Sequence, residues 1–149
     1  MNKFERIVVQ VPDIVGGYSQ GLKALVGKYS QYVAVADSRS IDGSVDIDAC
    51  TEDKYPAENR WDYVISYQGR AYYLEIHPAT NGSVKEVEAK LKWLKNWLSQ
   101  KAVALNGYPS GMPRFTWVHS GKCGLSKTST EYKRASILGM APTNILRLK

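Results

Sequence analysis

Apolar residues recur at helical spacing most clearly over residues 84–100, VKEVEAKLKWLKNWLSQ. Steps of three and four residues separate the members of this apolar set, which are Val84, Val87, Leu91, Leu94 and Leu98. Such spacing places them on one face of a helix. Ser83 comes just before the segment, and Glu86 follows Ser83 by three residues, which is the spacing of a capping box. The pattern predicts an amphipathic helix over 84–100 with one buried stripe.

Two weaker patterns predict further helices. Residues 17–30 carry Tyr and Leu at helical spacing, although Gly21 and Gly27 interrupt the segment. Residues 129–140, STEYKRASILGM, follow a loop rich in serine and glycine and predict a late helix.

Short apolar runs bounded by turn residues predict the strands. In SVDIDAC, Val45 and Ile47 alternate with Asp46 and Asp48, the pattern of a strand with one solvated face. The predicted strands are 6–11, 31–37, 44–50, two in the hairpin 61–77, 114–119 and 144–148. With the helices, they predict an α/β fold with a mixed sheet, formed by residues 1–149 as a single domain.

The hairpin WDYVISYQGRAYYLEIHPA, residues 61–79, carries two acids and a histidine. Gln68 and Gly69 fit a two-residue turn, which would make Asp62 and Glu75 direct cross-strand neighbours. His77 would point to the same face as Glu75, because side chains alternate along a strand. The opposite face is apolar and is expected to pack on a helix; it holds Trp61, Tyr63, Ile65, Tyr67, Tyr72, Leu74 and Ile76.

Two carboxylates with Cβ atoms roughly 5 Å apart repel each other unless a cation or a proton lies between them. Carboxylates, carbonyl groups and waters are the usual ligands of Mg²⁺, so Asp62 and Glu75 are candidate metal ligands. The structural alternative is equally simple. Asp62 would pair with Arg60, Glu75 would face solvent on an edge strand, and His77 would end the strand before Pro78.

Charge is distributed unevenly along the chain. The net formal charge is +6; residues 1–84 contribute −3 (8 Lys/Arg, 11 Asp/Glu) and residues 85–149 contribute +9 (12 Lys/Arg, 3 Asp/Glu). A basic half indicates either a polyanionic partner such as nucleic acid or a solvated basic surface.

The segment 120–130, SGKCGLSKTST, lies between a predicted strand and a predicted helix, where phosphates are often bound. The cations of this region are candidate contacts to a nucleic-acid backbone: Lys122, Lys127, Lys133 and Arg134. A flexible basic loop without a ligand is the alternative.

The chain lacks membrane and secretion signals. No apolar run reaches the roughly 20 residues of a membrane helix, and the N-terminus lacks the layout of a signal peptide. Cys50 and Cys123 are far apart and have no metal-binding spacing. We therefore expect free thiols in a cytoplasmic protein that has no membrane partner.

The hairpin resembles the active-site core of the PD-(D/E)XK nuclease superfamily, the restriction-endonuclease-like fold. In that family an Asp on one strand and an acid-x-Lys on the next are joined by a hairpin, and a long helix follows. Asp62 and Glu75-Ile76-His77 occupy these positions here, followed by the helix from Val84. The resemblance implies an αβββαβ core with helices on a central mixed sheet. Two positions depart from the motif: Trp61 stands in place of Pro, and His77 in place of Lys.

The resemblance implies Mg²⁺- or Mn²⁺-dependent hydrolysis of phosphodiester bonds in DNA or RNA. Asp62 and Glu75 would be metal ligands, and His77 or a migrated ammonium group from Lys90 would position the attacking water. Asp46 or Asp48 could add a further acid. The alternative is a catalytically inactive nuclease fold that binds nucleic acid or a protein partner. A homodimer is also compatible with this fold.

Overall fold

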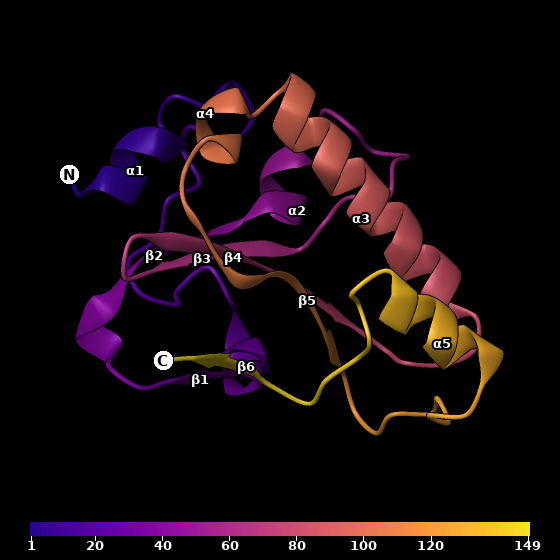
Figure 1. The fold of residues 1–149 in the computed structure, drawn as a ribbon. Helices are drawn as coiled ribbons and strands as arrows, with labels where there is room; N and C mark the ends of the chain where they lie inside the picture. The colour runs from indigo at the N-terminus through magenta and orange to yellow at the C-terminus, as the bar shows by residue number, and fades with distance from the viewer.

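A four-stranded mixed sheet in the order β2-β3-β4-β5 organises the chain (Figure 1). The computed structural model describes all residues, 1–149. β3 runs antiparallel to both of its neighbours, whereas β4 and β5 are parallel. The strands are β2 (Ile41–Asp46), β3 (Tyr63–Tyr67), β4 (Arg70–His77) and β5 (Ser110–His119). The predicted α/β class with a mixed sheet is therefore confirmed.

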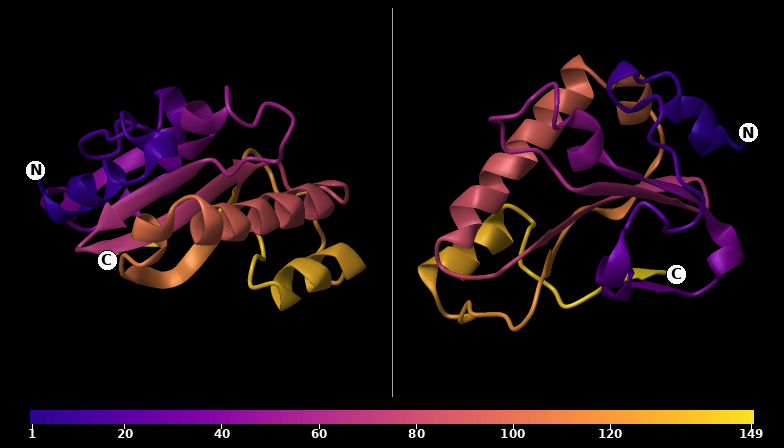
Figure 2. Two further views of the ribbon diagram at one scale, coloured as in Figure 1. Left: turned by 90° about the horizontal axis from the view of Figure 1, so that it is seen from above. Right: turned by 180° about the vertical axis from the view of Figure 1, so that it is seen from behind.

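Helix α3 (Ser83–Gln100) joins β4 to the parallel strand β5 and covers one face of the sheet (Figure 1). α1 (Lys3–Val8), α2 (Ile47–Thr51) and α4 (Val103–Asn106) contribute buried residues to the same core. α5 (Thr130–Ile137) lies beside the N-terminal half of α3, as both views show (Figure 2). The helices therefore form a layer on the side of the sheet that carries Tyr73 and Glu75.

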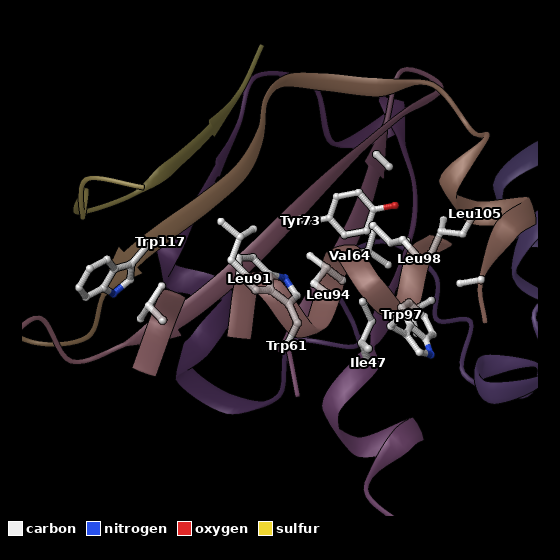
Figure 3. Packing of buried hydrophobic residues seen from close by; sticks show 14 of the residues in the cluster. Ile47, Trp61, Val64, Tyr73, Leu91, Leu94, Trp97, Leu98, Leu105 and Trp117 are labelled. Carbon is white, nitrogen blue, oxygen red and sulfur yellow. The ribbon is translucent and has the colours of Figure 1, made fainter. Parts of the chain in front are cut away.

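The stripe predicted for 84–100 is confirmed, and it forms the centre of the core. Leu91, Leu94 and Leu98 are buried and pack with Val64 and Tyr73 of the sheet (Figure 3). Burying a leucine side chain contributes about 2 kcal/mol to stability, so this stripe fixes the position of α3 on the sheet. The register of the helix decides which of its polar residues face the strands.

The opposite face of the sheet packs on a second, two-stranded sheet, β1 (Val33–Val35) with β6 (Leu146–Leu148). Ile65 and Leu74 lie in this second core. The expectation that the apolar face of the hairpin packs on a helix is therefore wrong. Both faces of the hairpin are largely apolar, and the crossover helix α3 covers the face that carries the acids.

The prediction of a capping box at the start of α3 is also wrong. Ser83 is the first residue of the helix, and its Oγ accepts a hydrogen bond from the backbone N–H of Thr80, 3.1 Å away. Glu86 bonds to His77 instead of returning to the helix start. Both side chains thus connect α3 to the chain that enters it.

The strand predicted over 6–11 is wrong, because residues 6–8 belong to helix α1 and residues 9–11 form a turn. Asn2 caps α1, with its side-chain oxygen accepting from Glu5 N at 2.8 Å. Phe4 and Val8 are four residues apart and both fully buried. Their burial on one side of the helix outweighs the strand preference of the β-branched residues.

The helix predicted over 17–30 is wrong as well. This segment forms turns followed by a 3₁₀ helix, Gly27–Tyr32. Gly21 and Gly27 adopt φ values of +53° and +61°, which an α-helix does not contain. The segment predicted as a strand over 44–50 is a strand only to Asp46, whose carboxylate accepts from Ala49 N at 2.9 Å and caps α2.

The remaining predicted elements are present with shifted ends. They are the strands predicted at 31–37, 114–119 and 144–148, and the helix predicted at 129–140. The hairpin register is confirmed as well, because Tyr63 pairs with Leu74 and Tyr67 with Arg70. Both turn residues have positive φ, 52° and 72°, the conformation of a type I′ turn.

We expect Gly43→Ala to destabilise the protein by about 2 kcal/mol or more. Gly43 lies at an irregularity in β2 with φ of +155°, and a Cβ atom there would lie 2.3 Å from the Tyr18 ring. Gly82→Ala is the matched control, because φ is −72° and nothing lies within 4 Å. Urea unfolding of both variants measures the difference; equal stabilities would contradict this account of the β2 bend.

Candidate functional site

The hairpin brings Asp62 and Glu75 together, as its register predicts. Asp62 directly precedes β3 and Glu75 lies in β4. The backbone N–H of Asp62 donates to Glu75 Oε1 at 3.2 Å, and the backbone N–H of Ile76 donates to Asp62 Oδ2 at 3.0 Å. Each carboxylate therefore accepts a hydrogen bond from the other strand, which fixes the orientation of both.

Lys90 reaches this pair from α3. Its Nζ donates to Glu75 Oε2 at 2.6 Å and lies 3.7 Å from Asp62 Oδ1. The stripe on α3 directs Lys90 toward the sheet, one turn before Leu94. The three side chains form a cluster that we call the acid–lysine site.

The alternative in which Asp62 pairs with Arg60 and Glu75 faces solvent is wrong for both acids. Arg60 pairs with Asp48 at 2.8 Å, and not with Asp62. Glu75 lies on an interior strand and its side chain is fully buried, so it does not face solvent on an edge. Asp62 and Lys90 retain side-chain exposures of 20% and 22%, so the site opens to solvent on their side only.

Burial shapes the protonation of this site. Burial raises the pKa of Glu75 well above its usual value; the neighbouring Asp62 carboxylate adds to the rise, and Lys90 offsets part of it. Burial likewise raises the pKa of Asp62 against the opposing effect of Lys90. Burial alone would lower the pKa of Lys90, but Glu75 and Asp62 outweigh it and raise that pKa. The ammonium group is thus held in its charged form beside two acids that repel each other.

His77 lies next to this cluster and makes a separate pair with Glu86. Its Nε2 is 2.8 Å from Glu86 Oε2, and its Nδ1 is 2.8 Å from the carbonyl oxygen of Pro78. Both ring nitrogens of His77 therefore have partners within the protein, which fix the orientation of the ring.

The sequence contained a signal for the Glu86 contact that our predictions missed. Glu75 and His77 are two residues apart on β4, and Glu86 and Lys90 are four apart on α3. Two residues of a strand and four residues of a helix both span about 6 Å. An acid and a base at matching spacings on the strand and on the helix predict two pairs, Glu75 with Lys90 and His77 with Glu86.

Two further acids lie beside Asp62. The backbone N–H of Ile47, between Asp46 and Asp48, donates to the carbonyl oxygen of Asp62 at 2.8 Å. Burial raises the pKa of Asp46; the Ala49 N–H bond opposes this, and the charges of Asp48 and Asp62 contribute to the rise. Lys90 pairs with Glu75 and lies near Asp62, and Arg60 pairs with Asp48, whereas Asp46 and Glu52 have no cationic partner, so acids outnumber cations in this neighbourhood.

The donor set suits a hard divalent cation in kind. Carboxylate oxygens are preferred ligands of Mg²⁺, and the excess of acids would be balanced by one such ion. No group of three or more His, Cys, Asp and Glu side chains is arranged to hold a metal ion. Backbone carbonyl groups and waters would therefore have to complete the ligand set, as is usual for Mg²⁺.

The four predicted nucleic-acid contacts lie on the loop after β5 and on α5. Lys122, Lys127 and Lys133 are exposed, while Arg134 bonds to Glu88 of α3, with its Nε 3.3 Å from Glu88 Oε2. The loop is anchored near the end of β4, because Gly124 N donates to the carbonyl oxygen of Ala79 at 2.8 Å. The structure thus gives one of the four cations a partner within the protein.

Comparison of the chain with models of protein families, with curated proteins and with solved structures finds no match. None of the helices combines the length and apolar character that a bilayer-spanning segment needs. Cys50 and Cys123 are both free thiols.

We expect Lys90→Met to lower the free energy of unfolding by about 3 kcal/mol at pH 8. The substitution leaves two buried carboxylates without a cation. The loss should be smaller at pH 5, where a proton can replace the ammonium group. Lys85→Met, at an exposed position of the same helix, should change stability by less than about 0.5 kcal/mol. Urea unfolding at both pH values tests this; equal losses for the two variants would contradict it.

We also expect the free energy of unfolding of Glu75→Gln to rise relative to that of the wild type as the pH increases from 5 to 8. A carboxyl whose folded pKa is raised takes up a proton on folding, so its contribution to stability declines above its unfolded value of about 4.5. Glutamine does not titrate and removes this decline. The stability difference should shift by about 1 kcal/mol or more between the two pH values, and chemical denaturation would reveal it. A constant difference would mean that the pKa of Glu75 is the same in the folded and unfolded chain.

Proposed function

We propose that the protein is a metal-dependent nuclease that hydrolyses phosphodiester bonds, with Asp62, Glu75 and Lys90 as its catalytic groups. The observation that carries the proposal is the acid–lysine site itself. The ammonium group of the following helix lies 2.6 Å from Glu75 Oε2 and 3.7 Å from Asp62 Oδ1, and the two acids come from paired strands. Buried charges of this kind cost stability, and their retention favours a functional role.

The topology supports the resemblance to PD-(D/E)XK nucleases. β2, β3 and β4 form an antiparallel series, α3 follows, and β5 returns parallel to β4. Apart from the short helices α2, between β2 and β3, and α4, between α3 and β5, this order matches the βββαβ part of the core that the resemblance implies. The candidate acids lie at its hairpin, where the family motif places them.

The residues have distinct roles in the proposed reaction. Asp62 and Glu75 would hold a Mg²⁺ or Mn²⁺ ion. The chemistry that such an ion supplies is polarisation of the scissile phosphate and activation of a water. Lys90, charged and partly exposed, would orient that water and stabilise the charge that develops on the phosphate. His77 would hold Glu86 and the start of α3, which leaves the ammonium role to Lys90.

One observation favours the alternative, a nuclease fold that binds nucleic acid without cleaving it. Lys90 Nζ already lies between the two carboxylates, where a bridging cation would otherwise balance them. A metal ion would have to share Glu75 with Lys90 or displace it. In this second candidate function the basic loop and α5 would bind a polyanion in a cytoplasmic setting, and the acid–lysine site would be structural.

An activity assay with single-stranded DNA, duplex DNA and RNA distinguishes the two. With Mg²⁺ or Mn²⁺, we expect the wild type to cleave at least one of them, and Asp62→Asn and Lys90→Met to lose about 100-fold or more in rate. Asp53→Asn, an exposed acid in the loop before the hairpin, should retain activity.

A melting experiment supplies the independent measurement. Mn²⁺ should raise the melting temperature of the wild type and leave that of Asp62→Asn unchanged, since only a ligand bound to the folded state stabilises it. Absence of cleavage together with absence of any shift would overturn the nuclease proposal in favour of the non-cleaving binder.

A further inference from the structure

A rigid aromatic stack lies along α3 beside the acid–lysine site. The rings of Trp93 and Trp97 are parallel to within 10°, with centroids 5.7 Å apart, and Tyr55 meets Trp93 edge-on at 5.9 Å. Trp97 is buried, and Trp93 is partly exposed. Stacked indoles that reach the surface offer a platform for another flat ring.

Hydrogen bonds hold the stack in place. Trp97 Nε1 and the Tyr55 hydroxyl both donate to Asp13 Oδ2, at 2.9 and 2.7 Å. Trp93 Nε1 donates to Glu58 Oε1 at 2.9 Å. With both indole nitrogens bonded, the rings cannot turn freely, so a ligand would meet a preorganised surface.

Beyond Trp93 the stack ends in a hollow. Trp97 covers one face of Trp93 from one turn ahead on the helix, whereas the residue one turn behind is the small Ala89. A cavity of about 670 Å³ lies there, lined by Ala57, Glu58, Asn59, Ala89, Lys92, Trp93 and Asn96. Its size is within the range of small-ligand sites. Polar side chains form most of its wall, so an apolar protein surface is a poor match for it.

The hollow and the acid–lysine site are built from the same two stretches of chain. Ala89 is the residue before Lys90, and Asn59 is three residues before Asp62. Lys90 and Asp62 are the two residues of that site that remain partly exposed, so a chain-like ligand seated on Trp93 would have to run only a short way along the surface to reach them. The exposed lysines of α3, Lys85, Lys92 and Lys95, favour a ligand with negative charge.

We propose that this hollow binds an unpaired base of single-stranded nucleic acid, which continues the stack of Trp97 and Trp93 while its backbone passes Lys90 and Asp62. Stacking on an aromatic ring requires an unpaired base with a free face. The amides of Asn59 and Asn96 would contact the edge of the base. The inference deepens the proposed nuclease function, on which it rests for the class of ligand, and makes single strands the substrate.

Binding without cleavage tests the inference. The full chain is titrated in EDTA with fluorescent oligothymidylate or oligouridylate of about 12 nucleotides, and with a duplex of equal length. The wild type should bind a single strand more tightly than the duplex. Ala89→Leu should weaken single-strand binding about tenfold, because the leucine covers the open face of Trp93 without removing the stack or a helix-forming residue.

Two further variants separate stacking from folding. Trp93→Phe keeps an aromatic face but loses the bond to Glu58, and it should lose less affinity than Ala89→Leu. Tyr29→Ala removes an exposed aromatic residue in the 3₁₀ helix Gly27–Tyr32 and should leave the affinity unchanged. Melting curves confirm that each variant is folded. Equal affinity of Ala89→Leu and the wild type, or equal affinity for single strands and duplex, would overturn the inference, whatever other partner the surface then binds.

The two proposals can fail separately. Single-strand binding that depends on the open hollow, without cleavage in Mn²⁺, would support the base site and reject the nuclease. Cleavage that Ala89→Leu leaves unchanged, with unchanged affinity, would support the nuclease and reject the base site.

Discussion

An ammonium group placed between a buried carboxylate and a partly exposed one is the interaction on which the rest of the structure depends. Helix α3 buries its apolar stripe on the face of the sheet that carries Glu75, and this packing would bring a hydrophobic helix over two like charges if Lys90 were absent. The leucines set the depth and register of the helix, and that register delivers Lys90 to Asp62 and Glu75. The packing of the core therefore determines the geometry of the site, and a shift of α3 on the sheet would move Lys90 away from the two acids.

The charge of the site contrasts with that of the chain around it. Acids outnumber cations around the hairpin and the start of α2, while residues 85–149 carry a net charge of +9. This contrast suits the proposed function. The exposed cations would attract a phosphate backbone, and the acids would attract the divalent ion that phosphate chemistry needs.

The features that the sequence predicted correctly are those set by short-range rules. The turn at Gln68 and Gly69 determines the register that pairs Asp62 with Glu75, and a continuous stripe determines α3. The errors come from long-range packing. The first half of the β-branched run at 6–11 is helical because Phe4 and Val8 are buried together in the core, and its second half is a turn. Which face of the hairpin the crossover helix would cover was not predictable either, since both faces carry large apolar residues.

The hairpin differs from the motif that it resembles at His77, which stands where the motif has a lysine. A lysine at that position would project from β4 beside Glu75, where Glu86 binds the imidazole ring of His77. Lys90 reaches Glu75 from α3, four residues after Glu86. Under the proposed function, His77 would hold the helix, and Lys90 would supply the ammonium group that the motif draws from its lysine. The arrangement also ties Lys90 to the same helix as Trp93, so that any movement of α3 would shift the ammonium group and the aromatic platform together.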